Sequence, residues 1–403
     1  MERRTQADGR AAYCERPVNF ERIYLDNAAT TPLRQEVADA MHAALEESGF
    51  NPSSLHAEGR KARAVLDEAR DRIAATLGAT RTEITFTASG TEANNLALFG
   101  MTRASAKGRH IVVSAIEHPA VLRPAAQLRD EGFEVTYLPV ASDGQVAADA
   151  FEAALRPGTV LASIMYANNE IGTVQPIRHL AEIAGRHGVA IHTDAVQAPS
   201  WLPCDVRELG VDLLSLSGHK FGGPKGTGLL YARRGLALAP LVHGGGQEFG
   251  RRSGTENVVG AAGMARALEL AAVGRAENIR RTAELRDQLE AGIRAGISDV
   301  HVNGTGAPRL ANNLSVSFAG VESEALLVGL DLAGVAVSAG SACTSGTLEP
   351  SHVLAALGLE PRWQTGAIRF SLGTTTRRAE IERVLVLLPG VVAQLRSPAP
   401  APR

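Results

Sequence analysis

The chain has 403 residues, of which 45% are hydrophobic and 21% are charged, and its formal net charge at pH 7 is -2. These values are ordinary for a globular enzyme with one large core and a smaller one, and the small net charge argues against nucleic acid or an anionic membrane as a partner. No apolar run approaches the roughly 20 residues needed to cross a bilayer. The three cysteines, Cys14, Cys204 and Cys343, are too few and too scattered for a disulfide framework or a tetrahedral zinc site, so we expect a cytoplasmic protein with no bound metal.

The first 22 residues mix basic and acidic side chains and contain no apolar segment. This composition is typical neither of a secretory signal nor of a transit peptide. We expect a flexible extension over 1–22, a large domain over 23–272, a small α+β domain over 273–396 and a disordered Pro/Ala-rich tail over 397–403.

Short apolar runs alternate with helical patterns through the first half of the chain. A short strand at Ile23 precedes two helices, around 33–47 and 55–77, and Gly78 closes the second helix. This alternation predicts an α/β fold with a mostly parallel sheet covered on both faces, in which functional groups gather at the carboxyl ends of the strands. The strands expected here are 83–87, 111–114, 134–138, 160–165, 190–193 and 211–216.

The second block of the chain begins with a helical pattern that extends from Gly260 to about Ala295. Shorter elements follow, and they predict the smaller α+β domain. They comprise strands near 313–318 and 367–372 and helices near 322–332, 350–357 and 378–395.

A glycine-rich stretch over 215–228 follows the strand 211–216 and contains Lys220. Its glycines let the backbone turn tightly and let a bulky group approach closely. Lys220, with Ser217 and His219 beside it, suits a lysine that forms a Schiff base with a carbonyl cofactor, flanked by donors to a phosphate. Taken alone, the stretch is equally typical of a surface loop with solvated lysines.

Three further clusters follow predicted strands. Gly90 and Thr91 open a helix and could cup a phosphate, or Ser89 or Thr91 could simply cap that helix. His118 could stack on an aromatic ring or transfer a proton, although a histidine before a proline is more often a satisfied loop residue. Asp194 could pair with a protonated ring nitrogen, or it could cap a helix.

The remaining candidates lie in the second half of the chain. The loop over 243–255, with paired arginines, suits an anion site or a subunit contact. Arg369 lies in an apolar strand and calls for an anionic partner, either a substrate carboxylate or a structural salt bridge. Cys343 lies among small residues, where a thiol is reactive, whereas Cys204 is typical of a small core residue and Cys14 lies in the extension.

Together these pieces resemble the cysteine desulfurases, pyridoxal-phosphate enzymes of the class V aminotransferase type. The resemblance runs from about Tyr24 to about Leu388, and the segment from Gly340 through Cys343 to His352 is similar to the long-loop branch of that family. The matching signatures are 24–31 (YLDNAATT), 89–95 (SGTEANN), 217–220 (SGHK), 252–257 (RSGTEN) and 340–345 (GSACTS).

The resemblance implies a fold-type I transferase with a mainly parallel seven-stranded sheet, a smaller α+β domain and pyridoxal 5′-phosphate as cofactor. It implies that Lys220 binds the cofactor, that His118 stacks on its ring and that Asp194 pairs with the ring nitrogen. Gln197 would contact the phenolic oxygen, and Asn169 would contribute to the cofactor and substrate sites.

The resemblance also assigns the phosphate. Gly90, Thr91, Ser217 and His219 would hold it, and Thr255 would reach the phosphate of the neighbouring subunit of a homodimer.

The implied reaction converts L-cysteine to L-alanine, with Arg369 and Asn169 on the substrate carboxylate and with His118 as a proton donor or acceptor. Cys343 would take the sulfur as a persulfide for an acceptor protein, such as an iron–sulfur scaffold or a thiolation protein. A selenocysteine lyase or another class V transaminase is the alternative. Phe249 departs from the family pattern, in which an arginine is common at that position.

Overall fold

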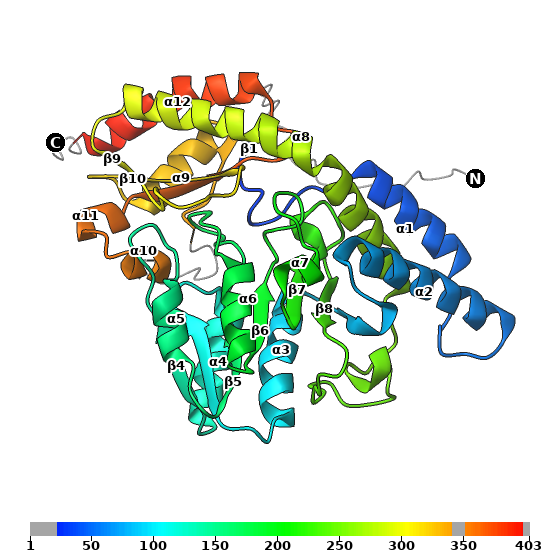
Figure 1. Cartoon of the computed structure of the whole chain (residues 1–403). Coiled ribbons are helices and arrows are strands. Elements are labelled where there is room, and N and C mark those ends of the chain that lie inside the picture. Colours follow the sequence, from blue (N-terminus) through cyan, green and yellow to red (C-terminus); the bar gives the residue numbers. More distant parts are fainter. Residues whose placement is uncertain (1–21, 341–350, 398–403) are drawn as a thin grey trace, which may run out of the picture.

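The computed structural model describes residues 22–340 and 351–397, so Cys14 and Cys343 lie outside the described residues. A seven-stranded sheet with helices on both faces forms the larger part of the molecule, and a three-stranded sheet with its own helices lies above it (Figure 1). The α/β prediction with a mainly parallel sheet of seven strands is therefore confirmed.

The strands of the large sheet stand in the order β2-β8-β7-β6-β5-β3-β4. Strands β3 to β7 run parallel to one another, whereas β8 runs antiparallel to both β2 and β7. The sequence analysis did not anticipate β8, which returns directly from the Lys220 loop. The strands are β2 (Ile84–Thr87), β3 (His110–Ser114), β4 (Glu134–Leu138), β5 (Thr159–Ser163), β6 (Ala190–Asp194), β7 (Leu213–Ser217) and β8 (Gly228–Ala232).

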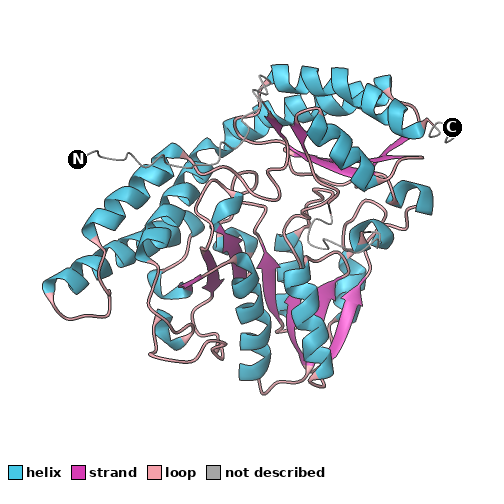
Figure 2. Ribbon diagram, turned by 180° about the vertical axis from the view of Figure 1, so that it is seen from behind, coloured by secondary structure: helices cyan, strands magenta, loops and turns pink. Residues whose placement is uncertain are grey.

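Most strands of the sheet are buried along their whole length, because helices cover both faces (Figure 2). This burial explains why the strands read as continuous apolar runs rather than as alternating patterns. The covering helices are α3 (Gly90–Ala104), α4 (Pro119–Asp130), α5 (Ala148–Ala154), α6 (Ile177–Arg186) and α7 (Val206–Leu209), and the 3-10 turns are η1 (Arg81–Glu83), η2 (Gly218–Lys220) and η3 (Glu248–Gly250).

Two N-terminal helices, α1 (Gln35–Glu47) and α2 (Ala57–Leu77), pack on the first part of α8 (Val258–Gly296). His56 caps α2 by accepting a hydrogen bond from the Gly59 N–H, and Gly78 ends it with a φ of 67°, a conformation that glycine adopts without steric cost. Both helices lie close to the ranges expected from the sequence.

The 39-residue helix α8 belongs to two cores. Its residues up to Ala271 pack in the core of the large sheet, and Leu285, Leu289 and Ile293 pack in a second core (Figure 1). The boundary expected between residues 272 and 273 falls inside this helix and stays a prediction.

The second core lies against the antiparallel sheet β12-β10-β9. A parallel pair, β1 with β11, joins the start of the described chain to this part of the molecule. Its elements are β1 (Ile23–Tyr24), β9 (Val300–Val302), β10 (Asn313–Phe318), β11 (Val335–Ala336), β12 (Ala367–Ser371), α9 (Ser323–Leu332), α10 (His352–Ala356), α11 (Pro361–Gln364) and α12 (Arg378–Arg396). No helix among the described residues is both long and apolar enough to cross a membrane.

Candidate active site

The strand ends of the large sheet bring the predicted residues together. Strands β3, β5, β6 and β7 are neighbours, and their carboxyl ends lead to His118, Asn169, Asp194 and Lys220 respectively. Because the four strands are parallel, these ends lie at one edge of the sheet. The charges of Asp194 and Lys220 both act on the His118 ring, which agrees with this placement.

Lys220 ends the turn η2 and points toward the segment 24–31. Its Nζ donates to the carbonyl oxygens of Ala28 at 2.6 Å and Ala29 at 2.8 Å. The Nε2 of Gln197 donates to the same Ala28 oxygen at 2.9 Å. Two of the predicted residues therefore meet at a backbone segment for which the sequence analysis had assigned no role.

Asp194 is buried at the end of β6, and both of its oxygens accept hydrogen bonds. Asn94 Nδ2 donates to Oδ2 at 2.6 Å, and the N–H of Val196 donates to Oδ1 at 3.0 Å. These two hydrogen bonds fix the orientation of the carboxylate. Asn94 is a residue that the sequence analysis missed; the 89–95 signature contained it, but nothing in the sequence indicated what it contacts.

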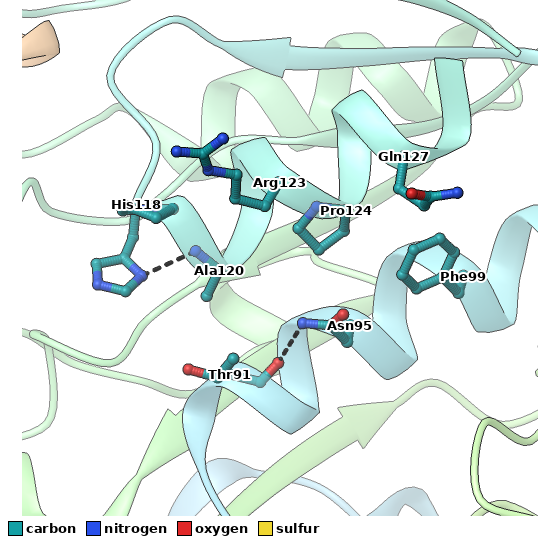
Figure 3. A pocket seen from close by; sticks show the side chains of 9 residues that line it. Thr91, Asn95, Phe99, His118, Ala120, Arg123, Pro124 and Gln127 are labelled. Carbon is teal, nitrogen blue, oxygen red and sulfur yellow. Dashed lines mark hydrogen bonds between the residues drawn. The ribbon is translucent and has the colours of Figure 1, made fainter. Parts of the chain in front are cut away.

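His118 caps helix α4, since its Nδ1 accepts the N–H of Ala120 at 3.0 Å (Figure 3). Burial lowers the pKa of His118, the charges of Lys220 and His352 lower it further, and only Asp194 opposes them. The ring is therefore neutral near pH 7, with its proton on Nε2 because Nδ1 is the acceptor. The sequence had left a site role or a satisfied loop residue as alternatives for His118; the structure shows it as the cap of α4 at the strand-end edge.

Gly90 packs closely against the side chains of Val196 and Ser217, an arrangement that we call the Gly90 cradle. A Cβ placed on Gly90 would lie 2.8 Å from Cγ2 of Val196 and 3.1 Å from Cβ of Ser217, so only glycine fits here without a shift. Ser89 caps the helix that Gly90 begins, which leaves the exposed Thr91 hydroxyl at the first turn. Thr91 and His118 line the same groove between α3 and α4, about 530 Å³ in volume (Figure 3).

His219 lies beside this cradle, and its Nδ1 is 3.1 Å from the hydroxyl of Thr30. Burial, followed by the charges of Lys220 and Lys225, lowers the pKa of His219 to about 4. A neutral imidazole can donate one hydrogen bond to an anion without bringing a buried charge of its own.

Arg369 in strand β12 is buried, and its guanidinium reaches the same region from the smaller sheet. Its Nη2 donates to Oδ1 of Asp26 at 2.8 Å and its Nη1 donates to the backbone oxygen of Asn169 at 2.8 Å. Asn169 thus meets Arg369 through its carbonyl rather than its side chain. The structural salt bridge that the sequence left open is present, and the neighbouring Asn169 places Arg369 at the strand-end edge.

Two buried acids near the site were not anticipated. Glu117 accepts hydrogen bonds from Ser114 Oγ at 2.6 Å and from the N–H of Met165 at 2.7 Å, yet burial raises its pKa to about 8. Glu170 accepts a hydrogen bond from Ser351 Oγ at 2.5 Å, and burial raises its pKa as well. Glu117 precedes His118 in the sequence and Glu170 follows Asn169, but only their burial in the fold distinguishes these two acids from surface acids.

The loop over 243–255 is fastened to its own chain. Arg252 Nε donates to Glu92 Oε1 at 2.8 Å, and Arg251 Nη1 donates to the oxygen of Thr82 at 3.0 Å, so the paired arginines have protein partners rather than an open anion site. Thr255 is exposed, and within residues 22–340 and 351–397 no hydrogen bond joins it to the other site residues.

A buried ion pair anchors the middle of this loop. The guanidinium of Arg70 donates to both oxygens of Glu248, at 2.6 and 2.7 Å, and lies between the rings of Phe86 and Phe249. Arg70 also donates to the oxygen of Ile84, and Glu248 accepts the N–H of Phe86. The pair therefore satisfies backbone groups on the outer side of β2, which is an edge strand.

Of the cysteines, only Cys204 lies in the described part of the chain. It is buried, and burial raises the pKa of its thiol to about 12, so it is a core residue as expected and not a reactive thiolate. Cys343, the predicted sulfur acceptor, lies outside the described residues.

Comparison with known proteins decides the family. A family model described as aminotransferase class-V matches residues 23–384. The chain belongs to the class-V aminotransferases. A curated relative named cysteine desulfurase IscS, from Dictyoglomus turgidum, is 50% identical over 94% of this chain and 96% of its own length.

Solved structures of related proteins agree with this family. A structure described as a NifS-like protein superposes with a TM-score of 0.87 at 37% identity, covering 93% of this chain and all (100%) of that one. A second, described as SspA in complex with cysteine, has a TM-score of 0.76 at 37% identity and covers 87% of this chain and 98% of its own.

Class-V aminotransferases depend on pyridoxal 5′-phosphate, and the residues at the sheet edge fit that cofactor. The cradle at Gly90 excludes any side chain, and the neighbouring Ser217 and His219 supply neutral donors of the kind that a phosphate requires. Asp194 supplies a fixed negative charge, and Lys220 supplies an amine. This set of donors and charges suits a phosphorylated, protonated pyridine ring with a carbonyl group.

Proposed function

We propose that this class-V aminotransferase is a cysteine desulfurase, which converts L-cysteine to L-alanine and transfers the sulfur to Cys343 as a persulfide. The observation that carries the proposal is the meeting of Lys220 and Arg369 near one edge of the sheet, through the segment 24–31. An amine that can hold the cofactor and a guanidinium that can hold an amino-acid carboxylate then contact the same short segment. The relative named cysteine desulfurase supports the choice of reaction within the family.

The proposed roles follow from the contacts. Arg369 binds the carboxylate of the substrate and Lys220, once free of the cofactor, takes the proton from its α-carbon. Pyridoxal phosphate, when bound, supplies the electron sink that makes this proton acidic. Asp194, held in place by hydrogen bonds from Asn94 and Val196, would face the protonated ring nitrogen. The neutral His118 can donate the proton on Nε2 or accept one back.

The remaining cofactor contacts are proposed on the same basis. Gly90, Thr91, Ser217 and His219 hold the phosphate, because Gly90 and Thr91 open helix α3 while Ser217 packs against Gly90 two residues before His219. Gln197 and Asn169 lie beside Lys220 and Arg369 respectively, where they can contact the ring and the substrate.

The sulfur step uses a thiol of the chain itself. The Cys343 thiolate attacks the sulfur of L-cysteine, the carbon–sulfur bond breaks and the carbon is protonated, so that L-cysteine and one thiol become L-alanine and one persulfide. We propose Cys343 for this role because Cys204 is buried with a pKa near 12 and Cys14 lies in the N-terminal extension. The persulfide then passes to an acceptor protein, such as an iron–sulfur scaffold, in the cytoplasm.

We propose further that the enzyme works as a homodimer in which Thr255 contacts the phosphate of the partner subunit. Its exposure supports this role, as does the lack of a hydrogen bond between Thr255 and the other site residues among the described residues. Exposed apolar side chains on and beside α1, namely Leu33, Leu45, Phe50 and Leu55, support a subunit interface there. Mixed dimers of Lys220→Ala and Thr255→Ala chains test whether one cofactor site draws on two subunits.

Alanine formation from L-cysteine tests the proposed function. The purified protein should be yellow, borohydride should fix the cofactor to Lys220, and alanine should accumulate with each turnover. Lys220→Ala should form no alanine, whereas Lys107→Ala, a lysine bonded to the Gly188 oxygen away from the site, should behave as the wild type. An active but colourless protein, or a yellow protein that releases no alanine from cysteine, contradicts the proposal.

A further inference from the structure

The segment Tyr24–Thr31 connects the two sheets at the active site. Its start pairs with the smaller part of the molecule, because β1 pairs with β11 and Asp26 forms a bridge with Ser371. Its end lies on the Lys220 loop, since the N–H of Thr31 donates to the oxygen of His219 at 2.8 Å. One short stretch therefore contacts both Arg369, through Asp26, and Lys220, through Ala28 and Ala29.

Asp26 is the member of this segment that carries a charge. Its Oδ1 accepts a hydrogen bond from Nη2 of Arg369 at 2.8 Å. Arg369 is only 3% exposed, and a guanidinium that is buried without an anion is strongly destabilising. Asp26 is itself 20% exposed, so the pair lies at the wall of the site and not inside a core.

The guanidinium of Arg369 keeps unused donors. Nη1 donates to the oxygen of Asn169 and Nη2 to Asp26, while the buried Nε has no hydrogen-bond partner. Within residues 22–340 and 351–397, three of the five side-chain N–H groups of Arg369 donate no hydrogen bond. A carboxylate prefers to accept two guanidinium N–H groups side by side. An amino-acid carboxylate can thus join Arg369 without displacing Asp26.

We propose that Asp26 is a positioning residue that serves as the resident counter-ion of Arg369 and thereby sets how strongly the site binds an amino-acid carboxylate. The proposal rests on the proposed role of Arg369 in holding the substrate carboxylate. Asp26 holds the guanidinium toward the site when no substrate is bound. Once substrate binds, the carboxylates of Asp26 and of the substrate both lie beside the Arg369 guanidinium. Because the two carboxylates repel each other, the charge of Asp26 lowers the affinity of Arg369 for the substrate.

A substitution that removes the negative charge of Asp26 but keeps the shape of its side chain tests the proposal. In Asp26→Asn the amide oxygen still accepts from Nη2, but the second anion is gone. The cofactor-loaded variant should bind L-alanine about tenfold more tightly than the wild type, since a single opposing charge within a few ångströms has been removed. Binding of L-alaninamide, which has no carboxylate, should not change. Calorimetric titration measures both constants without any turnover.

A purely structural role for Asp26 predicts a different pattern. Loss of the segment's position would weaken L-alanine and L-alaninamide together, and that result, or an unchanged affinity for L-alanine, overturns the proposal. The KM for cysteine should fall in Asp26→Asn while Arg369→Gln raises it. If the wild type forms no alanine from cysteine, the proposed desulfurase function fails, but the titrations still decide the role of Asp26.

A double-mutant cycle guards against a variant that folds poorly. Asp26→Asn should lower the thermal midpoint, because it leaves Arg369 buried without its anion, and Asp26→Asn/Arg369→Gln should recover most of that loss. Additive effects of the two substitutions would show that the residues do not act as a pair and would overturn the proposal.

Discussion

Two arginine side chains are almost fully enclosed, Arg70 in α2 at 1% exposure and Arg369 in β12 at 3%. The carboxylate that faces Arg70 belongs to Glu248, is 1% exposed and accepts two guanidinium bonds, and aromatic rings lie on both sides. The carboxylate that faces Arg369 belongs to Asp26, is 20% exposed and accepts one. Nε lacks a partner in both arginines, so the unused Nε alone does not mark a binding site.

The difference lies in what surrounds each pair. Arg70 and Glu248 satisfy backbone groups of the edge strand β2 and anchor the loop that carries Thr255, and both side chains are 1% exposed. Arg369 lies between the partly exposed carboxylate of Asp26 and the backbone oxygen of Asn169 at a strand end. A buried ion pair joined by two hydrogen bonds stabilises the fold. An arginine whose acidic partner is partly exposed and accepts only one hydrogen bond can bind a second carboxylate.

The largest expected effect is on the stability of the enclosed pair. Arg70→Leu or Glu248→Gln should each lower the free energy of unfolding by about 3–5 kcal/mol, because one buried charge loses its partner. Urea unfolding at fixed protein and cofactor concentration measures this. Arg280→Gln, which breaks an exposed pair with Glu277, is the matched control and should change stability by less than about 0.5 kcal/mol. If Arg70→Leu and Glu248→Gln lower the free energy of unfolding no more than this control does, the buried pair does not stabilise the fold.

Arg369→Gln should act on binding more than on stability. Loss of charged hydrogen bonds to the substrate should raise the KM for cysteine about ten- to a hundredfold. The yellow colour should persist, since Lys220 and Asp194 are unchanged. Steady-state kinetics and the cofactor spectrum separate the two effects. Arg72→Gln, which breaks a part-buried pair with Glu269, is the control and should leave the KM unaltered. An unaltered KM in Arg369→Gln as well would show that Arg369, like Arg70, has only a structural role.

The smallest expected effect concerns Phe249, whose ring centroid lies 5.1 Å from Cζ of Arg70 and whose φ is 59°. Phe249→Ala should cost about 1 kcal/mol through loss of the cation–π contact. Phe249→Gly should cost less than Phe249→Ala, because glycine adopts a positive φ without strain. The same urea titration compares the two. An equal loss in both variants would mean that the backbone at this position is not strained.

The strand-end residues could be predicted because a parallel sheet delivers every carboxyl end to one edge. Lys220, Asp194 and His118 each follow an apolar run that the sequence shows directly. Strand β8 was missed because it follows a glycine-rich loop and returns antiparallel. Strands β9 and β11, with three and two residues, are too short to give a pattern.

The partners of the site residues could not be predicted, because they are far apart in sequence. Asp26 and Arg369 are separated by 343 positions, Asn94 and Asp194 by 100, and each pair is fixed only by the folded chain. The paired arginines of the loop 243–255 illustrate the same limit. Their pattern suits an anion site or a subunit contact, and it does not reveal that Arg252 pairs with Glu92 and Arg251 with a backbone oxygen.

The central claim, sulfur transfer to a thiol of this chain, is tested most directly by a single turnover with L-cysteine. Wild type and Cys204→Ser should form alanine and gain the mass of one sulfur atom on the peptide that contains Cys343. Cys343→Ser should still bind cofactor and cysteine, since Lys220 and Arg369 are intact, but it should release almost no alanine, because a hydroxyl is a far weaker sulfur acceptor than a thiolate. Alanine release by Cys343→Ser at the wild-type rate would contradict the account.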